Sequence, residues 1–300
     1  MTGNPTEWVP RKLERVIPYA CWHTTLRCNM RPRCRWCYAP KSGPEVRGRE
    51  MVAVGGRLAR CCERVSLMGG EPLLNPDTLP VARMMRSAGC GLSLVTNGTL
   101  LTPDIVAELA RVLDRMSVSV DAVDQAVATA CRGSAYDIAR VICGVGLVAQ
   151  AGIPLKINTL ASSLNADHLP EIGRLLESLR RPVDWKLAEP AETAFTERGD
   201  IVPIRLERTD FLEIAADLAS RFPSLSVRTV LHDGIGDYVL VMPDGDLFIP
   251  SVNGSRPIGN VAHENPQDFL ARWGWDPSGN AELFKGRAAR RAAPETGCGE

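Results

Sequence analysis

Short runs rich in β-branched residues alternate with longer amphipathic stretches between residues 15 and 190, and this alternation limits the folds open to the chain. In stretches such as residues 79–90, 103–113 and 168–179, apolar residues recur every three or four positions, which is typical of helices. Strands that alternate with helices of this length form βαβ units and a parallel sheet. We therefore expect an α/β fold with six strands and at least five helices before residue 190, as an open doubly wound sheet or an incomplete barrel.

Local signals set the ends of these elements. Asn97 and Gly98 close a strand with a turn, and Thr102 with Pro103 provides a helix cap followed by a first-turn proline. After residue 190 the alternation stops. We expect one helix over residues 210–222 and a hairpin of residues 237–242 and 246–250, because Pro-Asp-Gly at 243–245 is a strong turn signal.

This pattern divides the chain into four parts. They are an N-terminal extension at 1–15, an α/β core at 16–190, a C-terminal extension at 191–285 that completes the barrel, and a mobile tail at 286–300.

Charge and hydropathy exclude several classes of protein. The 35 basic residues balance 35 acidic ones, so no net field would attract nucleic acid. No apolar run has the roughly 18 residues of a membrane span, and the first residues lack the order of a signal peptide. We expect a cytoplasmic protein that acts without nucleic acid or membrane.

Three of the ten cysteines, Cys28, Cys34 and Cys37, lie on one loop directly after the first expected strand. A cytoplasmic chain of this length does not need disulfides, so metal binding or catalysis is the better interpretation of a tight group. Three thiolates could hold zinc with Cys21 or His23 as a fourth ligand, although a second CxxC pair is absent. They could equally hold a four-iron cluster and leave one iron open to a cofactor or substrate. The other cysteines are expected to be structural.

Five segments carry a family resemblance. They read TLRCN…CRWCYA, LMGGEPLL, LVTNGTLL, SVSVDA and LKINTL, in this order within residues 16–190. Together they resemble the radical S-adenosylmethionine (SAM) superfamily, and in particular its single-cluster branch of viperin-like and MoaA-like enzymes. The resemblance implies an incomplete (β/α)6 TIM-like barrel with a short C-terminal α+β extension, and a site at the carboxyl ends of its strands.

The resemblance also implies roles for individual residues. Cys28, Cys34 and Cys37 match the ligands of a [4Fe-4S] cluster whose fourth iron is chelated by SAM. Glu71 matches the carboxylate that meets the SAM ammonium, and Arg132 would offer a bidentate fork to the SAM carboxylate. The full set of cofactor-binding residues is Trp36, Gly69, Gly70, Glu71, Thr96, Ser119, Arg132, Asn158 and Leu187. Asn97, Lys156 and Lys186 are the candidate catalytic residues facing the substrate.

The chain departs from the family pattern in one place. Five residues separate Cys28 from Cys34 where the superfamily usually has three, and Pro32 with Arg33 has the position of an insertion. Loop-closure entropy grows slowly with length, so the longer loop can still close on a cluster. The departure bears on the shape of the loop around the cluster and on the stability of the cluster to oxygen.

The resemblance implies one cluster per chain, because only Cys298 follows the core and an auxiliary cluster cannot be built. It further implies reductive cleavage of SAM to a 5′-deoxyadenosyl radical, with electrons from a flavodoxin or ferredoxin-type donor. The radical would abstract hydrogen from a small polar metabolite such as a nucleoside, nucleotide or sugar derivative. A triphosphate is less favoured, since Asp184 lies next to the two expected phosphate contacts.

Three alternatives stay open. Lys156 and Lys186 could instead form ion pairs with Glu71, Asp121 or Glu189. The protein could be a peptide-modifying radical enzyme, or a non-catalytic zinc or iron-sulfur regulatory protein. His23 is expected to make a turn hydrogen bond.

Overall fold

The computed structural model describes residues 15, 17–40, 42–191, 201–231, 239–249, 256–272 and 274–275. The expected N-terminal extension (except Arg15), the tail at 286–300, residues 237, 238 and 250 of the expected hairpin, and parts of the expected C-terminal extension lie outside these residues.

Strands and helices alternate through the first 190 residues as expected. The strands are β1 (Ile17–Thr25), β2 (Cys62–Gly69), β3 (Gly91–Thr96), β4 (Arg115–Ser119), β5 (Leu155–Leu160) and β6 (Val183–Ala188). Between them lie α1 (Arg49–Cys61), η1 (Pro72–Leu74), α2 (Thr78–Ser87), α3 (Pro103–Ala110), α4 (Gln125–Arg132), α5 (Ile138–Gln150), η2 (Ala166–His168) and α6 (Leu169–Ser178). The later elements are η3 (Val202–Ile204), α8 (Arg208–Arg221), β7 (Ser226–Val230), β8 (Val239–Val241), β9 (Asp246–Phe248), β10 (Gly259–Asn260) and α10 (Pro266–Arg272).

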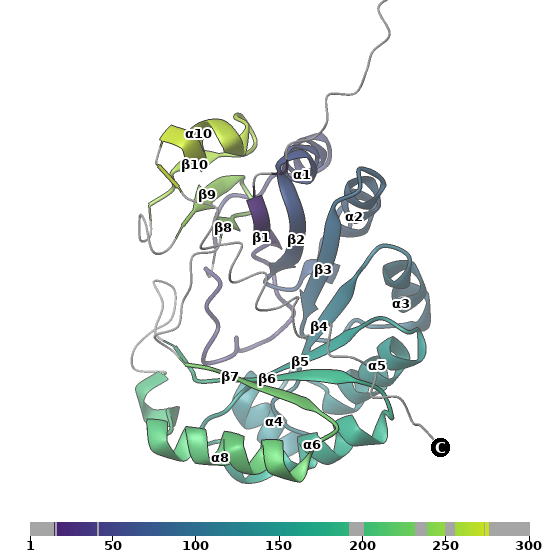
Figure 1. The fold of residues 1–300 in the computed structure, drawn as a ribbon, viewed down its shortest axis with the longest axis vertical. Coiled ribbons are helices and arrows are strands. Elements are labelled where there is room, and N and C mark those ends of the chain that lie inside the picture. The colour runs from purple at the N-terminus through teal and green to yellow at the C-terminus, as the bar shows by residue number, and fades with distance from the viewer. Residues whose placement is uncertain are drawn as a thin grey trace, which may run out of the picture.

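The described strands form one sheet in the order β10-β9-β8-β1-β2-β3-β4-β5-β6-β7. Pairing is parallel from β8 and β1 through to β7, and antiparallel within β8-β9-β10. The sheet curls like a partial TIM barrel, with helices α1 to α6 and α8 along its outer side (Figure 1). Residues after 190 therefore supply a strand to each end of the core sheet, β7 beside β6 and β8 beside β1.

The helix ends follow the local signals. The Thr102 hydroxyl accepts a bond from Ile105 N at 3.4 Å and Pro103 occupies the first turn of α3. Gly98 has φ +86°, as the turn after β3 requires, and the hairpin β8-β9 forms around Pro243–Gly245. These predictions are confirmed.

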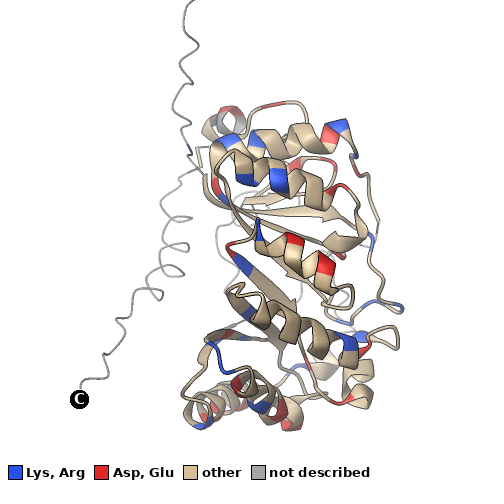
Figure 2. Cartoon of the chain, turned by 90° about the vertical axis from the view of Figure 1, so that its right-hand side faces the viewer, with Lys and Arg blue, Asp and Glu red and all other residues tan. Residues whose placement is uncertain are grey.

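The two faces of the sheet differ in character. Side chains that face the helices are apolar and buried, among them Met116, Ile157 and Trp185. Trp185 Nε1 donates to Thr159 Oγ1 at 2.9 Å, and that hydroxyl donates to the carbonyl of Val120 at 2.6 Å. These bonds connect β6 and β5 to the residue that follows β4, and thereby fix the register of polar residues on the concave face. The outer helices carry charges of both signs (Figure 2).

Among the described residues, we find no helix with the length and apolar character needed to cross a bilayer.

Candidate active site

The three thiols lie on the loop that follows β1, at the carboxyl edge of the sheet. Cys34 and Cys37 are joined by a turn in which Cys37 N donates to Cys34 O at 3.1 Å. Burial raises the pKa of the Cys34 thiol to about 11, while Arg132 lowers it and Cys37, Asp121 and Cys28 raise it. Burial likewise raises the pKa of Cys28, which also senses Cys37. The pKa of each of these two thiols is thus raised by at least one other thiol of the loop. A metal that binds them as thiolates would displace their protons.

The insertion in this loop has a structural role. Arg33 donates through Nη1 to the carbonyls of Ala39 at 3.3 Å and Pro40 at 2.8 Å, and through Nη2 to Leu26 O at 2.9 Å. One side chain therefore connects both ends of the cysteine loop. The peptide bond between Arg31 and Pro32 is cis. The longer spacing is accompanied by its own cross-link, which shapes the loop around the thiols.

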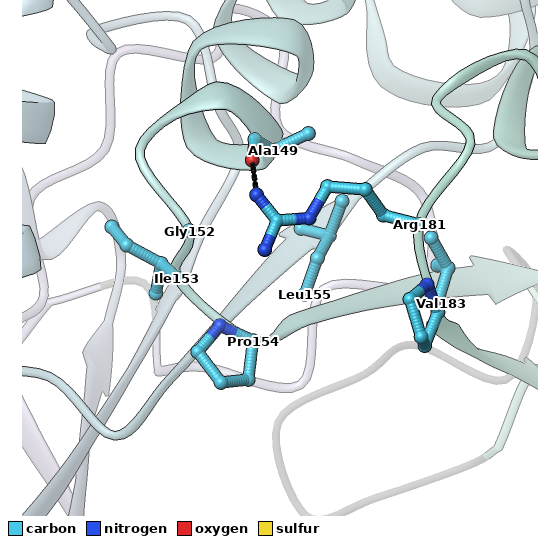
Figure 3. Close-up of a pocket in the computed structure, with 8 residues that line it drawn as sticks. Ala149, Gly152, Ile153, Pro154, Leu155, Arg181 and Val183 are labelled. Carbon is cyan, nitrogen blue, oxygen red and sulfur yellow. Dashed lines mark hydrogen bonds between the residues drawn. The ribbon is translucent and has the colours of Figure 1, made fainter. Parts of the chain in front are cut away.

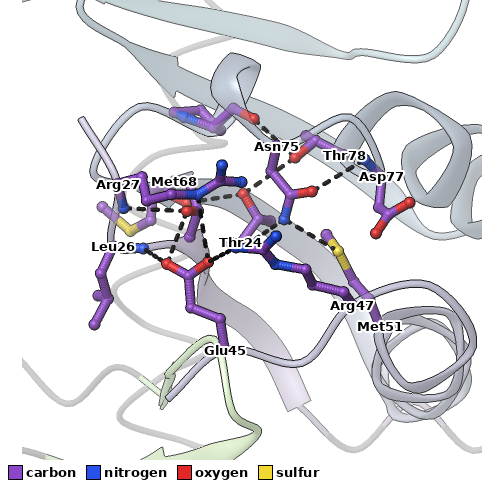
Figure 4. Close-up of polar contacts among 12 residues, drawn as sticks. Thr24, Leu26, Arg27, Glu45, Arg47, Met51, Met68, Asn75, Asp77 and Thr78 are labelled. Atoms are coloured by element: carbon purple, nitrogen blue, oxygen red, sulfur yellow. Dashed lines mark hydrogen bonds and ion pairs between the residues drawn. The ribbon is translucent and has the colours of Figure 1, made fainter. Parts of the chain in front are cut away.

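A second network holds the residues that lead into the loop (Figure 4). Glu45 Oε1 accepts bonds from Leu26 N at 2.6 Å and from Thr25 Oγ1 at 2.9 Å. Asn75, after β2, donates to Thr24 O at 2.7 Å. Because these groups are buried or partly buried, breaking any of these bonds would leave a polar group unsatisfied in the interior. The end of β1, and with it the start of the cysteine loop, is fixed from two sides.

Gly69 and Gly70 end β2 where the chain of β1 passes at close range. A Cβ at Gly69 would lie 2.2 Å from Thr25 O, and one at Gly70 would lie 2.2 Å from Arg27 O. The backbones are joined there by Gly70 N to Thr25 O at 2.7 Å and Glu71 N to Arg27 O at 2.8 Å. Side chains are excluded at both glycines because the strand ends pack backbone to backbone.

Glu71 follows this turn with its carboxylate fully buried. Oε1 accepts from Thr96 Oγ1 at 2.8 Å and Leu73 N at 3.2 Å, and Oε2 accepts from Asn97 N at 2.8 Å. Burial raises the pKa of Glu71 to about 7, although these hydrogen bonds and Arg132 lower it. A carboxylate has about four acceptor positions, so one position at Oε2 is left for a further donor.

This buried carboxylate leads to a pH prediction. Between the ordinary Glu pKa of 4.5 and about 7, the folded protein keeps a proton on Glu71 that the unfolded chain has lost. Folding stability therefore falls as pH rises through this window, by about 3 kcal/mol at most from this group. In the metal-free protein, Glu71→Gln is expected to remove this part of the decline, measured by urea unfolding at pH 5 and pH 7. Glu50→Gln, at an exposed position of α1, is the control; an equal slope in the Glu71 variant and the wild type would contradict the prediction.

Asn97 links the cysteine loop to the end of β3. Its Nδ2 donates to Asn29 Oδ1 at 2.8 Å and lies 4.0 Å from Cys28 Sγ. Its Oδ1 accepts from both the amide and the hydroxyl of Thr99, and that hydroxyl accepts from Asn29 Nδ2 at 2.8 Å. Asn97, expected to face the substrate, is thus engaged with the loop beside Cys28.

Arg132 is buried at the end of α4. Its Nε is bonded to Asp121, and its Nη1 lies 3.7 Å from Cys34 Sγ. The guanidinium stacks on Tyr136 at 5.2 Å, and the Tyr136 hydroxyl donates to Ser119 O at 2.6 Å. The expected contact with the SAM carboxylate stays a prediction, and the sequence did not indicate that Asp121 and Cys34 are partners of Arg132.

A row of polar residues crosses the concave face. Ser119, Asn158 and Lys186 are register partners on β4, β5 and β6. Residues paired in this way point to the same side of a sheet. The Oδ1 atom of Asn158 is buried and, among the described residues, has no hydrogen-bond partner; the same holds for Nε1 of Trp36 on the cysteine loop. A polar ligand with both donors and acceptors, such as SAM, would satisfy them, so the residues present fit the group.

Two other expected contacts differ in their placement. Trp36 is buried against Cys131, Ile201 and Ile204. The Leu187 side chain is fully buried in the main core, so its predicted contact with the cofactor would involve its backbone.

His23 differs from the prediction. It is 1% exposed, and neither ring nitrogen has a hydrogen-bond partner among the described residues, so the expected turn hydrogen bond is wrong. Burial lowers the pKa of His23 to about 4, which leaves the ring neutral, and the ring meets Tyr38 edge to face at 6.2 Å. A buried histidine of this kind gives no signal in the sequence pattern.

A cavity of about 190 Å³ lies at the opposite, amino ends of β5 and β6 (Figure 3). Its lining is mostly apolar, and Arg181 is bonded there to the carbonyl of Ala149. The thiols and Glu71 are absent from this lining, so we do not assign the site to it.

Within the described part of the chain, no three His, Cys, Asp or Glu side chains are arranged to hold a metal ion together. A [4Fe-4S] cluster does not require three side chains that converge on one ion, because each thiolate binds its own iron atom.

The chain is similar to known proteins in both sequence and fold. The family model of the radical SAM superfamily matches residues 22–176. The AdoMet-dependent heme synthase of Methanosarcina barkeri is 31% identical over 170 residues, which are 53% of this chain and 46% of that protein. The S-adenosylmethionine-dependent nucleotide dehydratase of Lacinutrix mariniflava is 28% identical over 314 aligned positions, covering 90% of this chain and 61% of that protein.

The chain therefore spans about half the length of these curated relatives. Among solved structures, Streptococcus suis SuiB bound to the precursor peptide SuiA superposes with a TM-score of 0.70 at 16% identity, over 87% of this chain and 66% of SuiB. This likeness shows the fold. Together with the family match over more than half of the residues, these findings establish that the chain belongs to the radical SAM superfamily, whose members use SAM and a [4Fe-4S] cluster.

Proposed function

We propose that this protein is a radical SAM enzyme that binds one [4Fe-4S] cluster through Cys28, Cys34 and Cys37 and acts on a small phosphorylated metabolite of the nucleotide class. One observation carries the reaction class. The loop with the three thiols is joined directly to the Gly69–Glu71 turn, through Gly70 N to Thr25 O and Glu71 N to Arg27 O. The three thiols and the Glu71 carboxylate thereby lie at one edge of the sheet, which supports their proposed roles as cluster ligands and as acceptor for the SAM ammonium.

When bound, the cluster supplies one electron that splits SAM into methionine and a 5′-deoxyadenosyl radical. The chain's own residues bind and orient the cofactors. Glu71 presents its remaining acceptor position to the SAM ammonium, and Ser119 and Asn158 bind polar groups of SAM from β4 and β5. A flavodoxin or ferredoxin-type protein is the proposed electron donor, and iron analysis should give four iron atoms per chain.

The substrate class rests on the charges of the concave face. On β4 to β7, the residues that share this face include Lys156, Lys186, Arg115 and Arg228, with Asp184 as the acidic residue among them. Such a face favours a ligand with several negative charges. The nucleotide dehydratase among the relatives, aligned over 90% of this chain, supports a nucleotide.

Asp184 no longer argues against a triphosphate. Arg228 donates two hydrogen bonds to the Asp184 carboxylate, from Nε to Oδ1 at 2.7 Å and from Nη2 to Oδ2. Arg115 Nη1 donates to Oδ2 at 3.3 Å. Two cations around one carboxylate leave a net positive group. Of the three acidic partners considered for Lys156 and Lys186, Glu71 is hydrogen-bonded at the end of β3 and Asp121 is paired with Arg132. Pairing with Glu189 stays an alternative.

The substrate prediction can be tested with Lys186→Ala. We expect the KM of the preferred nucleotide to rise by about 10- to 100-fold, because a charge-assisted hydrogen bond contributes about 1.5–3 kcal/mol. The measurement is 5′-deoxyadenosine formation by the reconstituted, dithionite-reduced enzyme with CTP, GTP, UTP, ATP and the matching nucleosides. Lys186→Arg retains the charge and should lose less, and exposed Arg140→Ala is the control.

Two outcomes would contradict the substrate assignment. Nucleosides could stimulate SAM cleavage as well as the triphosphates do, or Lys186→Ala could leave every KM unchanged. Stimulation by peptides in the same assay, and by none of the nucleotides, would favour a peptide-modifying enzyme instead.

A further inference from the structure

The buried Arg132 side chain is held in one orientation by two neighbours, Asp121 and Tyr136. Its Nε is bonded to Asp121, whose other oxygen accepts from Leu160 N at 2.8 Å. Its Cζ lies over the Tyr136 ring at 5.2 Å, and the Tyr136 hydroxyl donates to Ser119 O. A guanidinium fixed in this way cannot change direction without breaking a buried ion pair, which costs several kcal/mol.

With Nε turned to Asp121, the nitrogen Nη1 is directed at Cys34 Sγ, 3.7 Å away. The other two thiols have different neighbours. Cys28 Sγ lies 4.0 Å from the neutral amide of Asn97, and Cys37 Sγ contacts the carbonyl of Ala39 at 4.0 Å. Among the described residues, Cys34 is thus the thiol with a cationic donor at its sulfur.

We propose that Arg132 is a positioning residue for the cluster, whose Nη1–H bonds the Cys34 sulfur and raises the reduction potential of the cluster. This inference rests on the proposed ligand role of Cys34. It differs from the expected contact between Arg132 and the SAM carboxylate, because it requires no SAM.

The direction of the change in reduction potential follows from charge. Reduction adds an electron to the cluster and its sulfur ligands, and a hydrogen bond to a sulfur stabilises the reduced form more than the oxidised form. Asp121 opposes the effect, but it is bonded to Nε, whereas Nη1 is the nitrogen at the sulfur.

The test is an EPR-monitored redox titration of the reconstituted protein without SAM. Arg132→Gln is expected to shift the midpoint potential downward at an unchanged content of four iron atoms. Because this variant leaves Asp121 buried without its partner, Arg132→Gln combined with Asp121→Asn replaces the ion pair by two neutral amides and should shift the potential in the same direction. Arg140→Gln, an exposed arginine of α5, should leave it unchanged.

Arg132→Lys separates charge from hydrogen bonding. One ammonium group cannot hold Asp121 and also reach the sulfur as the two guanidinium nitrogens do. The midpoint potential of the Arg132→Lys variant should therefore fall as in the Gln variants. A potential equal to wild type in both Gln variants would overturn the inference, and a wild-type potential in Arg132→Lys alone would overturn its hydrogen-bond basis. Failure of the wild-type protein to assemble a cluster would instead refute the proposed function.

Discussion

Replacing Cys34 with alanine is expected to reduce 5′-deoxyadenosine formation to the level measured without protein. Cys34 is the middle ligand of the proposed cluster, and its sulfur is placed by the turn to Cys37 and by Arg132. A cluster with two thiolates has lost a third of its anchoring bonds. The variant should bind fewer than four iron atoms after anaerobic reconstitution, and the 5′-deoxyadenosine assay with SAM and dithionite measures the activity.

Cys143→Ala is the matched control, because this cysteine is exposed on α5. A second variant is needed because Cys131 is buried next to Cys34 and senses its charge. If Cys34→Ala retains iron, the double variant with Cys131→Ala will show whether Cys131 replaces the missing ligand. Full activity in that double variant would exclude Cys34 as a ligand.

Gly70→Ala is expected to destabilise the protein by about 3 kcal/mol or to prevent folding. The added Cβ would lie 2.2 Å from Arg27 O and 2.7 Å from Leu26 O, and both obstacles are backbone atoms. The strand ends would have to separate, and the bonds from Gly70 N and Glu71 N to the β1 side would lengthen or break. Urea unfolding of the metal-free protein measures the loss.

Gly146→Ala provides the comparison. This glycine lies in α5 with open space around its Cβ position, so alanine should stabilise the helix by about 0.5–1 kcal/mol. Equal stabilities of the two alanine variants would show that the end of β2 can move away from β1, and would contradict the close packing described above.

Hydrophobic periodicity was sufficient to predict the strands and helices of the core, because each strand buries an apolar face against the helices, as at Ile157 and Trp185. It could not choose between a doubly wound sheet and a barrel. That choice depends on pairing between distant strands, such as β1 with β8, which leaves no trace in local sequence.

The candidate site likewise has residues that the sequence indicates and contacts that it does not. Cys28, Cys34, Cys37 and Glu71 could be identified because motifs place them next to strand ends. The ion pairs of Arg228 and Arg115 with Asp184 depend on register across β4 to β7, and the partners of Arg132 depend on how α4 packs. Interactions of this kind join residues that are far apart in the chain, and neither periodicity nor spacing indicates them.

The pairing of β1 with β8 has a consequence for synthesis on the ribosome. β1 and the cysteine loop leave the ribosome before β8, the strand that covers the outer edge of β1, which follows about 200 residues later, on the order of 10 s or more at typical translation rates. During that interval the edge of β1 presents open backbone groups next to three reduced thiols. β1 thus depends for its protection on residues that are made about 200 positions later, and iron delivered before residue 241 is made would meet an incompletely paired site.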